Sequence, residues 1–393
     1  DGWVKTIKDL GLQFDFVSSQ DVAAKGISNE KYKVLILPLV FALSNEEVRH
    51  IEEFVSRGGV VVADSWPGVL NQHCSWQMSD AVNKLFGITA ADSSKRELKL
   101  LPGDIRKPST AGWTLASNDF TGLRAAEADI HAASGATALL QIAGTDAAIV
   151  NNRGKGWTVY LNTTWDQYPK QRATNFGGVA YRELSRAILD KAGVRPSVQV
   201  LSPDGHPVSQ LQIARYKFGG SEVVAIVKEN VALKGVVGQD GVTTYSDAKL
   251  GEVAKQELTI KLPYKAYVAD VRTGKQFGYT DVVHTSILIG DAIVLGLNRK
   301  DNQISIQSPS AAQRGEHVTL NLISTNNDAS LTRCHVTGPN GSFLSVYSSN
   351  ALLQNGRGNF VLPFALNDEP GKYLIKVTDV VSGASTEKTI ELR

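Results

Sequence analysis

The chain has 393 residues, of which 20% are charged and 42% are hydrophobic, and its formal net charge is +2. This length predicts two to four domains, and the near balance of charge, without long lysine or arginine clusters, argues against nucleic-acid binding. No apolar run reaches the roughly 18 to 20 residues that cross a bilayer, which argues against a membrane partner.

Residues 1–197 alternate helices and strands, which predicts an α/β domain. Val34-Leu35-Ile36-Leu37 and Val60-Val61-Val62-Ala63 are continuous apolar runs, as expected of strands that are buried on both faces of a parallel sheet. The expected elements, in chain order, are a helix over 4–10, strands over 14–17 and 34–37, a helix over 45–57, a strand over 60–63, a helix over 78–86, strands over 97–100 and 138–142, a hairpin over 147–162 and a helix over 179–192.

The first β-α-β unit has clear helix signals. Ser44 and Glu47 have the spacing of a capping box, in which each side chain satisfies a free backbone N–H of the other residue. Gly58-Gly59 supplies the left-handed stop of the helix. Ligand sites of doubly wound folds lie beyond the carboxyl ends of the strands, where Asp64, Ser65 and Trp66 follow the second strand.

From Arg195-Pro196-Ser197 onward the period changes to strands and turns. Residues 198–298 predict an antiparallel β-sandwich, with strands over 210–217, 223–228, 257–262, 267–271 and 293–297. A polar linker over 298–302 precedes a second sandwich, 303–393. Its strands are expected over 304–306, 318–323, 334–336, 359–364, 372–377 and 388–392, and its regular turn signals are typical of an immunoglobulin-like module.

The order of these pieces resembles the class I glutamine-amidotransferase-like (flavodoxin-like) domain that follows the catalytic barrel of family-42 β-galactosidases, known there as the trimerisation domain. The sandwich after it resembles the small β domain that closes such enzymes, and the immunoglobulin-like module is an addition. The motifs that carry the resemblance are Leu37-Pro38, Leu43-Ser44-x-Glu46-Glu47, Phe54-Val55-x-x-Gly58-Gly59, Val60 to Asp64, the hairpin Gly154 to Leu161, and Tyr267 to Lys275.

The sequence departs from that family in two ways. The resemblance implies a catalytic pair of glutamates on a barrel of roughly 250 residues, and nothing here can form that barrel. A nucleophile elbow, Gly-x-Cys-x-Gly or Gly-x-Ser-x-Gly, is missing from the first 200 residues, and Cys74 falls some ten residues after the strand. We therefore assign no catalytic residue to this chain.

Aromatic and acidic residues follow two strands at the expected ligand-bearing edge. Aromatic faces stack on sugar rings and carboxylates bind hydroxyls, so these residues form a candidate saccharide patch. The alternative is that they cap the sheet edge or pack against another subunit or a missing barrel. The candidate substrate-binding residues are Asp64, Trp66, Trp165, Asp166 and Tyr168.

Cysteine and histidine give no metal site and no cofactor site. Cys74 and Cys334 lie in different expected domains, so a disulfide between them is not expected. His73-Cys74 is a close His–Cys pair, and it is read as packing or surface because adjacent residues point apart. The alternative is that Cys74 acts as a catalytic nucleophile that is displaced from the usual strand end.

Three functions remain open. The first is a non-catalytic C-terminal assembly or accessory region of a β-galactosidase-like glycoside hydrolase, with a homo-oligomer or a missing N-terminal barrel as its partner. The second is a carbohydrate-binding module or stand-alone polysaccharide-associated protein. The third is a free-standing hydrolase or amidotransferase-like enzyme, whose activity thiol modification of Cys74 would abolish. Because the chain begins at Asp1 and holds a single methionine, Met78, we expect a mature or trimmed product, and the trailing module favours an extracytoplasmic location.

Overall fold

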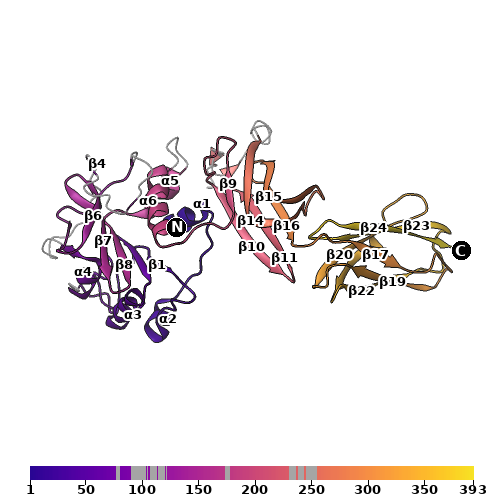
Figure 1. Cartoon of the computed structure of the whole chain (residues 1–393), viewed down its shortest axis with the longest axis horizontal. Coiled ribbons are helices and arrows are strands. Elements are labelled where there is room, and N and C mark those ends of the chain that lie inside the picture. The colour runs from indigo at the N-terminus through magenta and orange to yellow at the C-terminus, as the bar shows by residue number, and fades with distance from the viewer. Residues whose placement is uncertain are drawn as a thin grey trace. The chain divides into compact units, whose positions relative to one another are not determined.

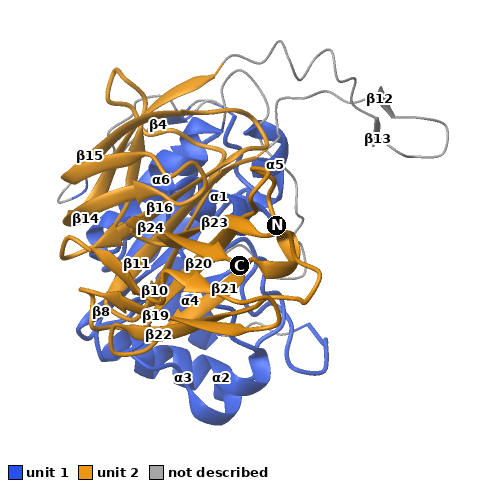
Figure 2. Cartoon of the chain, turned by 90° about the vertical axis from the view of Figure 1, so that its right-hand side faces the viewer, with its two compact units in different colours: residues 1–196 blue, residues 197–393 orange. Residues whose placement is uncertain are grey.

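The computed structural model describes residues 1–76, 80–89, 103, 105–106, 113, 120, 122–172, 178–229, 236–237, 243–244 and 255–393. The chain divides into two compact units, residues 1–196 and 197–393 (Figure 2). Within the described residues, no helix has both the length and the apolar character that crossing a membrane requires.

The first unit is built on one mixed sheet (Figure 1). Its first three strands are parallel to one another, and the remaining strands join antiparallel. In spatial order the strands are β1 (Val34–Leu37), β2 (Val60–Asp64), β8 (Gly156–Leu161), β7 (Thr145–Arg153), β6 (Thr137–Ile142) and β4 (Ile105–Arg106). A short pair, β3 (Ile88–Thr89) and β5 (His131–Ala132), lies outside it.

Helices cover both faces of this sheet, because the side chains of β2 alternate between two apolar cores. Val60 and Val62 pack with residues of α1 (Gly2–Asp9) and α6 (Val179–Lys191). Val61 and Ala63 pack with residues of α2 (Ser19–Lys25), α3 (Asn45–Ser56) and α4 (Asp80–Phe86). The flavodoxin-like α/β prediction is therefore confirmed, as is the burial of the second strand, every residue of which is buried.

The helix signals of the first β-α-β unit are confirmed in detail. The Ser44 hydroxyl accepts a hydrogen bond from the Glu47 N–H at 3.2 Å, and the Glu47 carboxylate accepts one from the Ser44 N–H at 2.8 Å. Gly58 has φ +111°, the left-handed region expected at this helix end.

One expectation for the first unit differs from the structure. Residues 14–17 do not form a strand, although their apolar and polar residues alternate. The helix expected over 78–86 is present as α4 over Asp80–Phe86, whereas Met78 and the strand expected over 97–100 lie outside the described residues.

The second unit begins with a single antiparallel sheet that curls around one apolar core, whereas a sandwich was expected there. The strand β14 makes the curl possible, because 259–261 pair with β9 while 267–270 pair with β16. The strands are β10 (Leu211–Phe218), β11 (Ser221–Lys228), β16 (Ala292–Asn298), β14 (Gln256–Asp270) and β15 (Gln276–Ile287), with β9 (Gln199–Leu201) beside β14 and a separate pair, β12 (Val236–Val237) and β13 (Thr243–Thr244).

The remainder of the second unit has two sheets that enclose a separate core, as an immunoglobulin-like sandwich does (Figure 1). Alternate residues of β19 and β23, such as Leu320 and Ile375, are fully buried in it. The three-stranded sheet contains β17 (Ile304–Gln307), β19 (His317–Ser324) and β22 (Arg357–Pro363). The five-stranded sheet contains β18 (Ala311–Ala312), β24 (Ser385–Leu392), β23 (Gly371–Asp379), β20 (Ser330–Thr337) and β21 (Ser349–Leu353).

Candidate functional site at the carboxyl edge of the parallel strands

Asp64 ends β2 and is the central group of this edge. Its side chain is 1% exposed and accepts hydrogen bonds from the Trp3 indole at 3.1 Å, the Leu39 N–H at 2.5 Å and the Trp165 N–H at 3.4 Å. These donors lie on α1, on the loop after β1 and at the start of the short 3-10 helix that follows β8. One carboxylate therefore joins the N-terminal helix to the segments that follow the two strands flanking β2.

Burial raises the pKa of Asp64 to about 6, because a charged carboxylate loses its hydration there. The hydrogen bonds from Leu39, Trp165 and Trp3 oppose this effect, since they stabilise the charged form. A carboxylate with three structural donors holds the edge together, and its burial leaves no oxygen for a saccharide hydroxyl.

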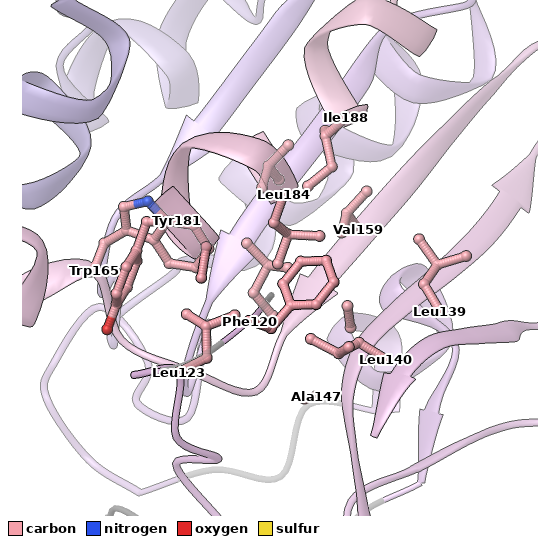
Figure 3. Packing of buried hydrophobic residues seen from close by; sticks show 14 of the residues in the cluster. Phe120, Leu123, Leu139, Leu140, Ala147, Val159, Trp165, Tyr181, Leu184 and Ile188 are labelled. Atoms are coloured by element: carbon pink, nitrogen blue, oxygen red, sulfur yellow. The ribbon is translucent and has the colours of Figure 1, made fainter. Parts of the chain in front are cut away.

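Trp165 lies inside the protein. It belongs to the short 3-10 helix η2 (Trp165–Gln167) and is 1% exposed. One face stacks on Trp3 at a centroid distance of 4.4 Å and an interplanar angle of 7°. Tyr181 of α6 meets the ring edge-on at 5.2 Å, and Figure 3 shows the two rings side by side in the core. Because its ring is covered, Trp165 packs the core and is not a sugar-stacking platform in this structure.

Tyr168 is also fully buried, at the start of α5 (Tyr168–Gln171). Its hydroxyl donates to Asp9 at 2.5 Å, and the same carboxylate binds Arg172 through Nε at 2.8 Å and Nη2 at 2.5 Å. Both charged side chains are at most 1% exposed. Burial and the Asp9 charge raise the pKa of Tyr168, so the phenol stays neutral. This buried group ties α1 to α5.

Trp66 and Asp166 are the candidate residues that reach solvent. Trp66 is half-buried, has φ +60°, and contacts Phe41 at 6.0 Å and Trp76 at 5.9 Å between ring centroids. Trp76 is 64% exposed. Asp166 is exposed and accepts a hydrogen bond from the Thr164 hydroxyl. We call Phe41, Trp66 and Trp76 the edge aromatic cluster.

Sequence reasoning did not find Phe41 and Trp76, although each follows a parallel strand within one loop. Trp76 stands two residues after Cys74, in a turn whose sequence carries no strand or helix pattern. Their loops are held together by the hydrogen bonds from Leu70 N to Phe41 O at 2.8 Å and from Gly68 N to Val40 O at 3.0 Å. The cluster is therefore an ordered aromatic surface.

Thiol and metal chemistry gain no support at this edge. Cys74 is exposed in a turn where the Asn71 side chain accepts the N–H groups of His73 and Ser75. Cys334 is free and buried, and burial raises its pKa to about 11. Among the described residues, no group of three or more His, Cys, Asp or Glu side chains could hold a metal ion.

The second unit carries a different aromatic surface on the outer face of its curled sheet. Tyr267 pairs with Tyr279 across β14 and β15, and their rings are 5.1 Å apart. Tyr216 lies on the same face, and the cross-strand row from it to β14 passes through Gly296 and Ala269, which Val381 and Gly383 cover. Tyr216, Tyr267 and Tyr279 are 60%, 38% and 58% exposed, whereas the opposite face carries the core.

Comparison with known proteins finds a family model and solved structures that share this architecture. A family model described as the β-galactosidase trimerisation domain matches residues 1–195. The β-galactosidase of Bacillus circulans sp. alkalophilus superposes with a TM-score of 0.51 at 17% identity, over 75% of this chain and 36% of that chain. The cold-adapted β-galactosidase of Rahnella sp. R3 gives 0.46 at 17% identity, over 74% and 35%.

The chain thus spans about a third of the length of these solved structures. A comparison with curated protein sequences finds no match. At this identity the superposition shows a shared fold, which extends beyond the first unit into the β-rich region. Residues 1–195 belong to the family of β-galactosidase trimerisation domains, and they are followed by a β-rich region that matches the C-terminal part of such enzymes.

Proposed function

We propose that this chain is the non-catalytic C-terminal assembly region of a β-galactosidase-like glycoside hydrolase. The match of residues 1–195 to the trimerisation domain carries the proposal. The first unit brings copies of the protein together, and the β-rich second unit supports or positions the catalytic part. The catalytic carboxylates then belong to a barrel outside this chain.

The structure of the strand edge supports a role in assembly over one in catalysis. Asp64 and Asp9, both buried, are occupied by structural donors. Trp165 and Tyr168 are core residues. A glycosidase needs two carboxyl groups about 5 to 9.5 Å apart across an open cleft, and a carboxylate that is fully engaged in the core does not serve that chemistry.

An activity assay tests the non-catalytic part of the proposal. We expect the purified chain to release no nitrophenol from 2-nitrophenyl β-galactoside above the rate in buffer. Release at an enzymatic rate would contradict the proposal. If activity is found, the Cys74→Ser variant shows whether it depends on the thiol, since only a thiol-dependent enzyme loses activity with this change. The assembly part is tested by the mass of the chain in solution.

Binding of a carbohydrate is the second candidate function, and the outer face of the curled sheet favours it. Tyr216, Tyr267 and Tyr279 present exposed rings on one face, and aromatic rings stack on sugars. Affinity electrophoresis through gels that contain a soluble galactan tests this function. Retardation that Tyr267→Ala and Tyr279→Ala remove supports it, and unchanged migration excludes a galactan ligand.

A further inference from the structure

The first unit has a concentrated apolar surface that its fold does not use. Five of its described large hydrophobic side chains are exposed, namely Phe14, Phe16, Val17, Trp76 and Val179. Three of the five fall within residues 14–17, where Phe16 is 82% exposed. Isolated exposed apolar residues are ordinary, but a contiguous group marks an interaction site. We call residues 14–17 the phenylalanine segment.

The phenylalanine segment is anchored at Asp15, within it, and at Ser18 and Ser19, directly after it. The Asp15 carboxylate binds the Lys31 ammonium at 3.0 Å and the Tyr32 hydroxyl at 3.1 Å. After the segment, Ser18 caps α2 by accepting the Asp21 N–H at 3.0 Å, and Ser19 donates to Glu47 of α3. The contacts of Asp15 and Ser18 thus restrain the backbone on either side of Phe16 before any partner arrives, which lowers the entropic cost of binding.

These anchors place the segment along the outer edge of the sheet. Lys31 and Tyr32 precede β1, and Glu47 follows it, so the segment passes β1 in the direction of that strand. Within the described residues β1 is an edge strand of the sheet, and it pairs with β2 alone. Figure 1 shows the chain running from α1 to α2 on this side of the unit.

The two phenyl rings form one surface. Phe14 and Phe16 are two residues apart in the chain, and both are exposed. Their rings meet edge-to-face with centroids 5.3 Å apart and an interplanar angle of 89°. Asp15, which lies between them in the chain, binds Lys31 and takes no part in the ring contact. The two rings therefore form an apolar pair beside an ion-paired carboxylate.

We infer that the phenylalanine segment is the surface through which a second copy of this chain binds. The inference rests on the proposed function, because the trimerisation family of residues 1–195 is what identifies the occupant as another copy. In a ring of three copies each interface is head-to-tail, so each copy contributes this surface once and a different surface once. Rigid aromatic side chains are the usual energetic centres of such interfaces.

A double variant of the full 393-residue chain tests this inference. Phe14→Ser with Phe16→Ser removes the rings, and the fold is retained because neither side chain is buried. We expect the dissociation constant of self-association to rise by about 100-fold, since each buried aromatic residue of an interface is worth roughly tenfold or more. The matched control is Val346→Ser with Leu366→Ser, which removes side chains that are 81% and 78% exposed in the second unit.

Light scattering over a range of concentrations distinguishes the outcomes. Dissociation of the double variant, with the control and wild-type chains still associated, supports the inference. Equal association of all three chains overturns the inference and leaves the proposed function standing. A wild-type chain that is monomeric at every concentration overturns both.

Cross-linking gives an independent readout if the double variant does not fold. Phe16 is replaced by the photoreactive residue p-benzoylphenylalanine, which keeps the aromatic ring. Irradiation is expected to give covalent oligomers of the chain, and mass spectrometry of the products identifies the facing surface. Cross-links that stay within one chain, from a sample that light scattering shows to be associated, overturn the inference.

Discussion

Asp64 gives the most direct test of the electrostatics at the strand edge. Replacing it in the Asp64→Asn variant removes the titratable group and keeps the side-chain volume. One oxygen acceptor is lost, so the N–H of Leu39 or the donors from Trp3 and Trp165 face an amide NH₂ group. A buried donor without an acceptor costs about 1–3 kcal/mol, so we expect the variant to be less stable than the wild-type chain at pH 4, where Asp64 is largely protonated in the folded state.

The pH dependence carries the sharper prediction. The pKa of Asp64 is raised from its ordinary value of 3.8 to about 6 in the folded protein. Between these values the folded state binds a proton that the unfolded state releases, so acidification stabilises the fold. With these two pKa values, this group lowers the free energy of unfolding by about 2 kcal/mol as the pH rises from 4 to 6, and by a few tenths of a kcal/mol more above pH 6.

Tryptophan fluorescence reports the unfolding of the first unit, which contains Asp64. All six tryptophans, Trp3, Trp66, Trp76, Trp113, Trp157 and Trp165, lie within residues 1–196. Urea unfolding of the wild-type chain and Asp64→Asn is followed at pH 4, 5, 6 and 7. The stability of the wild-type chain relative to the variant is expected to be about 2 kcal/mol greater at pH 4 than at pH 7. A difference that does not vary with pH would refute the argument.

Three further changes follow from the structure. Arg172→Leu removes the cation that pairs with buried Asp9, so we expect the free energy of unfolding of the first unit to fall by about 3–5 kcal/mol. The control Lys170→Leu changes an exposed residue of α5 and should alter this free energy little, so equal losses in urea unfolding would argue against the buried pair. Gly156→Ala places a Cβ 2.1 Å from the Gly59 carbonyl oxygen and 2.4 Å from that of Val55, so a loss of about 1–3 kcal/mol is expected, and an unchanged urea midpoint would show that this packing is looser. Ellman's reagent is expected to label Cys74 at once and Cys334 only after unfolding, and two fast thiols in the native chain would contradict the burial of Cys334.

Local signals in the sequence predicted much of the fold correctly. The capping box of Ser44 and Glu47 depends on residues three apart, and the hairpin of β7 and β8 depends on a short glycine turn at Gly154. The apolar run of 60–63 predicted a strand buried on both faces, and β2 is fully buried. These features could be predicted because each one is decided by neighbours in the chain.

The strand predicted over 14–17 was wrong because alternation alone does not supply a hydrogen-bonding partner. Phe14 and Phe16 alternate with Asp15, but Asp15 is held by Lys31 and Tyr32, and the rings face solvent. The single curled sheet of the second unit was also out of reach, because the pairing of β14 with both β9 and β16 is set by long-range contacts.

The sequence predicted where the candidate site lies, but it did not predict which of its side chains are buried. The placement of Asp64 and Trp66 at a strand end followed from the β-α-β pattern. The burial of Trp165 and Tyr168 depends on Trp3 and Asp9 of α1, more than 150 residues away in the chain (159 for Asp9 and Tyr168). Contacts between residues so far apart leave no local pattern in the sequence. The aromatic residues that reach solvent at this edge are Trp66 and Trp76.

The mass of the chain in solution tests the central claim most directly. Light scattering coupled to size exclusion measures it across a wide concentration range, without a ligand or a label. If residues 1–195 act as a trimerisation domain, the mass reaches three times the chain mass of 42.3 kDa and holds there as concentration rises. A mass of 42.3 kDa at every concentration would contradict the assembly role.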